Sequence, residues 1–305
     1  MKITPLQAAK LLLNEKVVAI PTETVYGLAG SLYSEKAIRE IFSLKGRPAN
    51  NPLIVHIPSA EFIDNYVANY PSDFKALANT FWPGPLTLIL SASNIPSLAT
   101  AGLPTAAFRI PNHPVARKIL NLTGPLVIPS ANLSGKPSST TYEHVEKDFG
   151  EQMPVVDGGS CEKGLESTIL IFIENQWQIA RLGAIAAEDF HGILSYTPKY
   201  LSSSSSPICP GQLYRHYAPK AKLFLDNQFG QASLIIGFSD RVYPKTAEVW
   251  HFGNSNDPSG AAKRLYELLR ELDLQNKKEA WIDADFPQNG LWLTIMERLT
   301  KAAEN

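Results

Sequence analysis

The sequence predicts an α/β protein of two domains, the first built on a mixed sheet and the second a smaller Rossmann-like unit. Up to about residue 198, short apolar runs alternate with helical patterns, and some runs follow one another directly, which favours a mixed sheet over a strictly doubly wound one. Five consecutive serines within residues 201–207 indicate a flexible linker. The length of 305 residues also fits two domains of about 150 residues each.

Capping residues and apolar runs define the elements of the first domain. Thr4, Pro5 and Gln7 form the capping pattern of a helix start. The first elements are, in order, a helix to about residue 14, a buried strand at 17–20, a polar glycine-bearing loop at 21–30 and a helix at 34–44. Further strands are predicted at 53–57, 86–90, 107–110, 126–128, 167–173 and 177–180, and helices at 72–80, 114–120 and 142–149.

After the serine run, strands and helices alternate more regularly. The predicted strands are 222–225, 233–236, 247–252 and 280–284, and the predicted amphipathic helices are 257–272 and 291–302. This unit of about 85 residues lies near the lower end of domain size. We therefore expect a first domain at 1–198, a linker at 199–220 and a second domain at 221–305.

Composition and charge exclude several broad classes of protein. Hydrophobic residues make up 44% and charged residues 19%, as in a folded protein. The formal net charge is −1, so a phosphate-bearing partner must be met by a local basic cluster rather than by the overall field. Two cysteines, Cys161 and Cys209, form no disulfide framework and fit a reducing compartment. With neither a signal-peptide pattern nor a membrane-spanning run, we expect a cytoplasmic protein without a membrane partner.

The segment KGRPANNPLIVHI, residues 45–57, carries the densest functional signal. Lys45 and Arg47 stand two apart at the end of a predicted helix, and their side chains are the usual means of holding phosphate oxygens. Asn51 and His56 add neutral polar groups nearby. The alternative is that the two cations only complement a helix C-terminus. Two prolines fix the backbone at this bend, which favours recognition.

The loop PTETVYGLAG, residues 21–30, leaves a buried strand, which is where α/β proteins bind ligands. Thr22 and Thr24 offer hydroxyls, Glu23 offers a carboxylate, and two glycines permit close backbone approach. The loop is not a Walker A motif, because Gly-x4-Gly-Lys-Ser/Thr is absent from the chain. On its own, such a loop is also compatible with a simple turn.

Two further loops and two arginines complete the candidate pocket. The donor-rich segment PSANLSGKPSSTT, residues 129–141, suits phosphate or carboxylate, and GLEST, residues 164–168, enters the next apolar strand. Arg109 and Arg181 lie within or beside apolar strands, where an unpaired arginine would be costly, so each faces a cavity, a partner or a salt bridge. Many cations and hydroxyls with few bases suit a nucleoside triphosphate and a small carboxylate, with chemistry that rests on positioning and electrostatics.

These segments resemble the signature blocks of the threonylcarbamoyl-AMP synthases with a YrdC-like catalytic domain. The blocks are PTETVYGLAG, KGRPANNPLIVHI, FWPGPLTLIL, PSANLSGKP, GLESTI and CPGQLYRHYAP, in the family's order over about residues 17–219. The last block and the small domain resemble the long, two-domain form of the family. The resemblance implies an open, twisted mixed-sheet YrdC-like domain with a basic concavity and a Rossmann-like C-terminal domain.

The resemblance also implies a reaction. ATP, L-threonine and bicarbonate give threonylcarbamoyl-AMP and pyrophosphate, with Mg²⁺ bound together with ATP. The product supplies the threonylcarbamoyl group for modification of a tRNA adenosine next to the anticodon. A downstream threonylcarbamoyl transferase is an expected, transient partner, and contact with tRNA is allowed but not required.

Carried onto matching positions, the resemblance implies a set of residues for each substrate. L-threonine is expected at Thr24, with Thr22 as the close alternative, and at His56, Arg109, Ser130 and Ser167. ATP is expected at Lys45, Arg47, Asn51, Asn132, Thr140 and Arg181, with Thr105 in contact through its backbone and Tyr217 of the linker closing over the nucleotide. Lys45 and Arg47 are the expected catalytic residues, and no protein side chain is expected to bind a metal.

Three other functions remain as alternatives. A serine acyl hydrolase would use the S-x-x-K match at Ser160 and the S-x-N match at Ser130, but K-T-G is missing and the order is reversed. A non-catalytic RNA-binding module could use the same basic concavity, with steeply salt-dependent binding and no ATP consumption. A zinc enzyme is disfavoured, because the cysteines and histidines lack paired ligand spacing.

Overall fold

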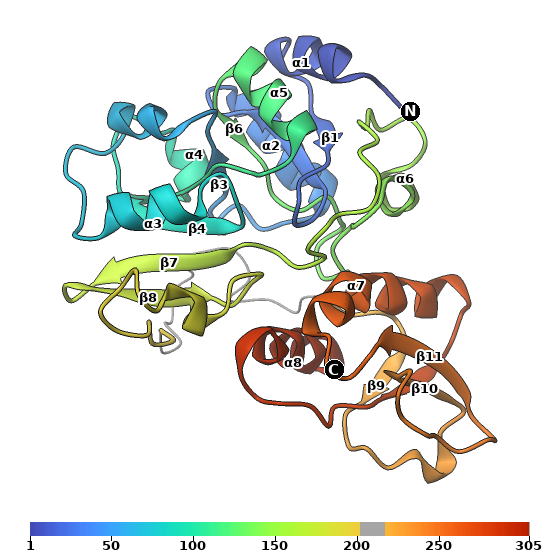
Figure 1. Cartoon of the computed structure of the whole chain (residues 1–305). Helices are drawn as coiled ribbons and strands as arrows, with labels where there is room; N and C mark the ends of the chain where they lie inside the picture. The colour runs from blue at the N-terminus through green and yellow to red at the C-terminus, as the bar shows by residue number, and fades with distance from the viewer. Residues whose placement is uncertain (202–216, 305) are drawn as a thin grey trace.

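The computed structural model describes residues 1–201 and 217–304, and these residues form two sheets (Figure 1). The N-terminal sheet has eight strands in the order β1-β2-β6-β3-β5-β4-β7-β8, and the C-terminal sheet has four in the order β11-β10-β12-β9. The pairs β3–β5 and β4–β7 are parallel and the other N-terminal pairs antiparallel, whereas every C-terminal pair is parallel. The predicted α/β class, mixed sheet plus small Rossmann-like unit, is therefore confirmed.

The elements follow the chain in the order expected for these sheets. The strands are β1 (Val18–Ile20), β2 (Gly27–Ser31), β3 (Ile54–His56), β4 (Leu86–Ser91), β5 (Thr105–Arg109), β6 (Leu126–Val127), β7 (Thr168–Ile173), β8 (Gln176–Arg181), β9 (Lys222–Phe224), β10 (Leu234–Phe238), β11 (Glu248–Gly253) and β12 (Glu279–Ile282). The α-helices are α1 (Pro5–Leu13), α2 (Glu35–Lys45), α3 (Phe74–Phe81), α4 (Ser97–Thr100), α5 (Pro114–Thr123), α6 (Tyr142–Phe149), α7 (Pro258–Leu274) and α8 (Gly290–Ala303). The serine run, Cys209 and the linker block up to residue 216 lie outside the described residues.

Local sequence signals account for most boundaries, and β2 is the main exception. Thr4 caps α1 in a capping box with Gln7, as predicted. The predicted loop at 21–30 is wrong in its second half, because residues from Gly27 onward pair with β1 in an antiparallel hairpin. Glycines and alanine make this strand unlike a typical β pattern. Gly27 is needed for close packing, since an added Cβ would lie 2.2 Å from Cγ2 of Ile128.

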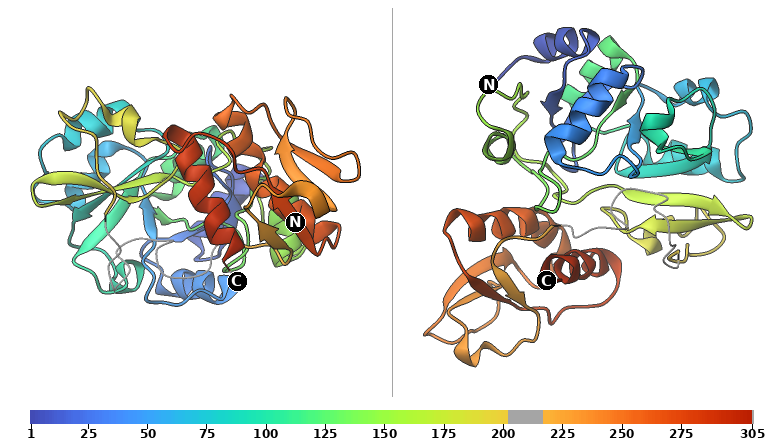
Figure 2. Two further views of the ribbon diagram at one scale, coloured as in Figure 1. Left: turned by 90° about the horizontal axis from the view of Figure 1, so that it is seen from below. Right: turned by 180° about the vertical axis from the view of Figure 1, so that it is seen from behind.

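Alternating side chains divide the large sheet into two faces. At the β1 edge, Val18 and Ile20 pack with residues of α1 and α5, whereas Val17 and Ala19 belong to the cluster that includes α2. This edge of the sheet is therefore a three-layer arrangement, which the two views of Figure 2 also show. The three layers bury apolar groups on both faces, and this burial is the main driving force for folding.

The far end of the sheet is covered differently. The main core takes Val55, Phe108 and Leu170 from one face. On the opposite face, a small cluster of strand residues, Ile54, Ile89, Ala107, Ile169 and Ile171, includes no buried residue from any described helix. Because strand side chains alternate with a period of two, His56 lies on the same face as Ile54, and Arg109 on the same face as Ala107. This face carries the candidate site.

The C-terminal domain packs against the N-terminal part through its helices. α7 and α8 lie on the side of the small sheet that faces the rest of the molecule (Figures 1 and 2). The hydroxyl of Thr294 donates a 3.0 Å hydrogen bond to the carbonyl of Gly183, and Tyr266 and Arg270 also reach the N-terminal part. Within the described chain, none of the helices has the length and apolar character needed to cross a membrane.

Candidate active site

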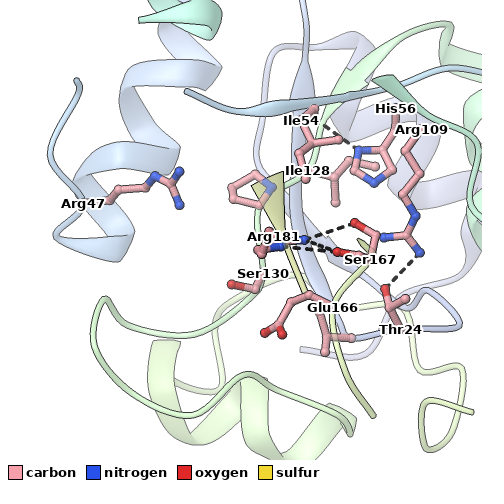
Figure 3. A pocket seen from close by; sticks show the side chains of 12 residues that line it. Thr24, Arg47, Ile54, His56, Arg109, Ile128, Ser130, Glu166, Ser167 and Arg181 are labelled. Atoms are coloured by element: carbon pink, nitrogen blue, oxygen red, sulfur yellow. Dashed lines mark hydrogen bonds between the residues drawn. The ribbon is translucent and has the colours of Figure 1, made fainter. Parts of the chain in front are cut away.

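A pocket opens where several strands end, on the face of the large sheet that carries Ile54 and Ala107 (Figure 3). It encloses about 440 Å³, a volume that includes the space at its open mouth. His56 ends β3 and Arg109 ends the parallel strand β5, in register with each other. Arg181 ends β8 opposite Ile169 of β7. The lining residues are Thr24, Val25, Arg47, Ile54, His56, Arg109, Ile128, Pro129, Ser130, Glu166, Ser167 and Arg181.

Arg109 is held in place from three directions. Its Nη2 donates to Oε1 of Glu23 at 2.7 Å and to Oγ1 of Thr24 at 2.9 Å, and its Nε donates to the carbonyl of Gly84 at 3.2 Å. Its Nη1 makes no hydrogen bond to any residue in 1–201 or 217–304. A guanidinium fixed through two nitrogens, with the third directed at a pocket, is suited to a carboxylate ligand.

His56 is a neutral side chain in this pocket. Burial, followed by the nearby charge of Arg109, holds the pKa of His56 well below its usual value. Its Nδ1 lies 3.2 Å from the carbonyl of Ile54, so Nδ1 carries the proton and donates. Nε2 is therefore an acceptor, able to receive a hydrogen bond from a hydroxyl or an ammonium group.

Ser167 and Arg181 form another part of the pocket wall. Nη2 of Arg181 donates to the backbone oxygen of Ser167 at 2.8 Å and to its Oγ at 3.1 Å. The hydroxyl of Thr87 lies 2.8 Å from the same Oγ. An added Cβ at Gly183 would lie 2.3 Å from backbone atoms of Ser167 and Thr168, so only glycine allows the chain after Arg181 to pass this closely.

Lys45 and Arg47 lie at the end of α2, as the sequence predicted. Gly46 between them has a φ of 60°, the left-handed conformation typical of a helix end. Nζ of Lys45 is buried and donates to the carbonyls of Ser130 and Asn132, at 2.5 and 2.7 Å. Burial, and then repulsion from Arg47, lowers the pKa of Lys45 well below its usual value. In Figure 3, Arg47 lies at one side of the pocket and His56 and Arg109 at the other.

The loop after β6 is anchored through its own polar groups. Nδ2 of Asn132 donates to the carbonyls of Leu133 and Lys136, and its buried Oδ1 has no hydrogen-bond partner in the described chain. The backbone N–H of Thr140 donates to Nδ1 of His144 at 3.2 Å. These contacts fix Asn132 and Thr140 within the loop, and neither residue lines the pocket.

Seven predicted residues line the pocket and seven do not. Thr24, His56, Arg109, Ser130, Ser167, Arg47 and Arg181 are in the lining. Lys45, Asn132 and Thr140 lie behind it, and Asn51 accepts from Nη2 of Arg47 at 2.7 Å. Thr22 supports Thr24, with 2.8 Å between their hydroxyl oxygens. Thr105 pairs with Ser91 at the start of β5. Tyr217 is buried between the domains, stacked on Tyr266.

Sequence reasoning missed the part of Glu166 in the site. The carboxylate lines the pocket and accepts from Ser138, Tyr266 and Arg298. Burial opposes its ionisation, but the charges of Arg298 and Arg181 and these hydrogen bonds lower the pKa of Glu166 to about 2. The only signal in the sequence was its place in GLESTI, because its partners Tyr266 and Arg298 lie 100 and 132 residues away in the chain.

The side chains do not build a metal cage. No group of three or more His, Cys, Asp or Glu side chains within residues 1–201 and 217–304 is arranged to hold a metal ion. Near the pocket, Glu23 and Glu166 are each engaged by an arginine.

Two family models match the chain, one in its N-terminal part and one in its C-terminal part. A family described as Telomere recombination matches residues 10–183, and one described as Threonylcarbamoyl-AMP synthase, C-terminal domain, matches residues 178–304. The chain is 39% identical to the threonylcarbamoyl-AMP synthase of Bacillus subtilis (strain 168), over 97% of this chain and 92% of that protein. It is 35% identical to the threonylcarbamoyl-AMP synthase of Pyrococcus abyssi, over 97% and 93% of the two chains.

Structural comparison agrees over the whole length. The fold superposes with a TM-score of 0.91 on a crystal structure of P. abyssi Sua5 complexed with L-threonine, at 33% identity. The match covers 99% of this chain and 96% of that chain, so it includes both sheets. By sequence, fold and domain order, the chain belongs to the threonylcarbamoyl-AMP synthase family, in its two-domain form.

Proposed function

We propose that this enzyme makes threonylcarbamoyl-AMP from ATP, L-threonine and bicarbonate, and releases pyrophosphate. The observation that carries the proposal is the convergence of Arg47, Arg109 and Arg181 with three hydroxyl side chains on one pocket. Cations and hydroxyls without an evident base suit a reaction in which negative charge is gathered and oriented. The names of its full-length relatives point to the same reaction.

L-threonine is proposed to bind between β3, β5 and the start of β7. Nη1 of Arg109 pairs with the substrate carboxylate, while Glu23 and Thr24 hold the rest of the guanidinium. Nε2 of His56 accepts a hydrogen bond from the substrate, and the hydroxyls of Ser130 and Ser167 complete the subsite. Thr22 acts through Thr24, with which it shares a hydrogen bond.

ATP is proposed to bind beside threonine, toward the end of α2 and the loop after β6. Arg47 and Arg181 offset phosphate charge from the two walls of the pocket. Lys45 fixes the backbone of the Ser130–Asn132 segment and places a basic group behind it. Asn51, Asn132, Thr140 and the backbone of Thr105 are proposed to complete the nucleotide site, with Tyr217 closing over it.

The proposed chemistry needs positioning more than proton transfer by the protein. The amine of threonine and bicarbonate give a carbamate and water. A carbamate oxygen then forms a bond to the α-phosphorus of ATP, and the bond from that phosphorus to pyrophosphate breaks. Mg²⁺ is proposed to enter with ATP, where it neutralises phosphate charge. His56 is proposed to orient its ligand through Nε2, as a neutral imidazole whose pKa is held below its usual value by burial and by Arg109.

The wider setting is also a proposal. We infer a division into residues 1–198, 199–220 and 221–305, with the linker acting as a lid that keeps water from the mixed anhydride. The product is consumed by a threonylcarbamoyl transferase that modifies a tRNA adenosine next to the anticodon. We propose that this occurs in the cytoplasm and requires no stable contact with tRNA by this chain.

One assay tests the proposed reaction. The protein is incubated with ATP and Mg²⁺, with L-threonine and bicarbonate added singly or together, and pyrophosphate is measured. Release that requires both additions is the expected result. Tight, salt-dependent RNA binding without any ATP consumption would instead favour the RNA-binding alternative and refute the synthase proposal.

A further inference from the structure

Arg298 of the C-terminal domain reaches the back of the active-site pocket. Its side chain has an exposed fraction of 0%, although it belongs to α8, far from the pocket residues in sequence. Its Nε lies 3.2 Å from Oε2 of Glu166, and its Nη2 donates to the carbonyl of Leu182 at 2.7 Å. Its Nη1 pairs with Glu297 of the same helix, a carboxylate that Lys301 also contacts. One guanidinium from the second domain thus holds two segments of the first.

Each of these two segments contains a residue that lines the pocket, Ser167 in one and Arg181 in the other. Glu166 directly precedes Ser167, and Leu182 directly follows Arg181. Ser167 and Arg181 are themselves joined, since Nη2 of Arg181 donates to the oxygens of Ser167. A displacement of Arg298 would therefore shift Glu166 and Leu182, and each of these is the direct chain neighbour of a lining residue.

The carboxylate of Glu166 poses an electrostatic problem for a phosphate-binding pocket. It lines the pocket and is ionised at neutral pH, because burial is outweighed by the charges of Arg298 and Arg181, which lower its pKa to about 2. An unneutralised carboxylate there would repel phosphate and attract Arg181, the other arginine whose charge acts on Glu166. Arg298 and the hydroxyl of Tyr266 both donate to Oε2, on the side supplied by the second domain.

We propose that Arg298 is a positioning residue for ATP: it neutralises Glu166 from behind the pocket, so that Arg181 stays on Ser167 and faces the nucleotide. Tyr266, whose hydroxyl donates to the same carboxylate oxygen at 2.8 Å, supports this arrangement. The C-terminal domain thereby completes the electrostatics of the pocket without contacting substrate. This inference rests on the proposed function, since it assigns the nucleotide to the Arg181 side.

A double-mutant cycle tests the proposal. The variants are Arg298→Met, Glu166→Gln and the two combined, with Arg264→Met as a matched control that removes an exposed arginine from the same domain. On the natural background, Arg298→Met should raise the KM for ATP about tenfold or more. On the Glu166→Gln background the same change should raise it by less than about threefold, because no carboxylate remains to capture Arg181. Arg264→Met should leave the KM for ATP unchanged on both backgrounds.

The pH dependence gives an independent readout. In Arg298→Met, Glu166 loses its largest attractive charge, so its pKa rises, and protonation at lower pH should relieve the competition for Arg181. Glu297 also loses its ion pair with Arg298, but it does so equally on the natural and Glu166→Gln backgrounds. The KM for ATP of this variant should therefore fall, relative to that of the natural protein, as the pH is lowered toward the raised pKa of Glu166. A purely structural brace predicts the same loss at every pH and on both backgrounds, and that result would overturn the proposal.

Two further measurements keep the outcome decisive. If Arg298→Met does not fold, the cycle is run with Tyr266→Phe, which removes only the hydroxyl; an equal effect with and without Glu166→Gln would then refute the proposal. If the natural protein releases no pyrophosphate with threonine and bicarbonate, the proposed reaction fails by itself. The inference about Arg298 is then tested by measuring the affinity of the same variants for ATP by calorimetry. If Arg298→Met weakens ATP binding equally with and without Glu166→Gln, or if the natural protein does not bind ATP, the inference is refuted.

Discussion

Nη2 of Arg109 lies 2.7 Å from Oε1 of Glu23, in an ion pair whose side chains are only 6% and 3% exposed. The second oxygen of Glu23 is buried and has no hydrogen-bond partner in the described chain. The pair joins the end of β5 to the loop after β1, and it keeps Arg109 against Thr24. Among the described residues, only one oxygen of this buried carboxylate has a hydrogen-bond partner. We infer that the ion pair orients Arg109 in addition to stabilising the fold.

Glu23→Gln should therefore impair both folding and threonine binding. Removing one charge of a buried pair typically costs about 3–5 kcal/mol, because the other charge is left uncompensated. Denaturant unfolding measures this loss, and the KM for threonine should rise because Arg109 is no longer held. Glu35→Gln is the control: its partner is Arg39, both side chains are 66% exposed, and the change should cost less than about 1 kcal/mol. Equal losses in the two variants would contradict the argument.

His56→Leu separates ligand orientation from proton transfer. The neutral imidazole offers Nε2 as an acceptor, so its loss should raise the KM for threonine about tenfold while kcat changes much less. Steady-state kinetics at several threonine concentrations measures the two constants. His251→Leu, which changes an exposed histidine of β11, should behave like the natural protein. A large fall in kcat at unchanged KM would identify His56 as a base instead.

The sequence predicted the elements well wherever a cap or an apolar run was local. Thr4 at the start of α1 and Ser34 at the start of α2 cap their helices through side-chain hydrogen bonds. α6 was expected at residues 142–149 and spans Tyr142–Phe149. β2 was missed because its glycines serve close packing, Gly27 against Ile128 and Gly30 against Ile41, and no local pattern encodes these contacts.

The candidate site was predictable only in part, for a related reason. Motif residues such as Arg109, Ser167 and Arg181 converge because their strands are neighbours or pair in register. Glu166 depends on Tyr266 and Arg298 from the other domain, and spacing along the chain cannot reveal such contacts. Lys45 was expected to contact phosphate directly, whereas in the structure its Nζ donates to the backbone carbonyls of Ser130 and Asn132.

Lys45→Met should strongly reduce turnover. The methionine keeps most of the length but cannot donate to the carbonyls of Ser130 and Asn132, so two buried acceptors lose their partner. We expect kcat/KM for ATP to fall by about a hundredfold, as the loop after β6 loses its anchor. Lys36→Met, at an exposed position of the same helix, is the matched control. Near-normal rates in Lys45→Met would refute its assignment to the site.

Gly183→Ala should disrupt the wall formed by Ser167 and Arg181. The added methyl group would lie 2.3 Å from backbone atoms of Ser167 and Thr168, and backbone cannot move aside as a flexible side chain can. Activity should fall and the melting temperature should drop. Gly230→Ala is the control, since an added Cβ there meets nothing within 4 Å. A fully active Gly183→Ala variant would show that this close approach is dispensable.

His144 should make stability depend on pH. Burial, and then the charge of Arg270, lowers the pKa of His144 to about 4. The N–H of Thr140 donates to its Nδ1, and a proton on that nitrogen would break the bond. In the unfolded chain a histidine takes up its proton near pH 6.5, so between about pH 6.5 and 4 the unfolded state binds more protons. Stability must then fall as pH falls through this window and level off below it.

The size of the effect and its removal can both be measured. For these two pKa values, the contribution of His144 to the free energy of unfolding should decrease by about 2 kcal/mol between pH 7 and 5. His144→Gln should make the dependence shallower without abolishing it, because the pKa of His56 is also lowered and acts in the same direction. His251→Gln, at an exposed position, should leave the slope unchanged. Denaturant unfolding of the three proteins across this range decides the matter: an unaltered slope in His144→Gln would mean that this imidazole is not kept neutral by the fold.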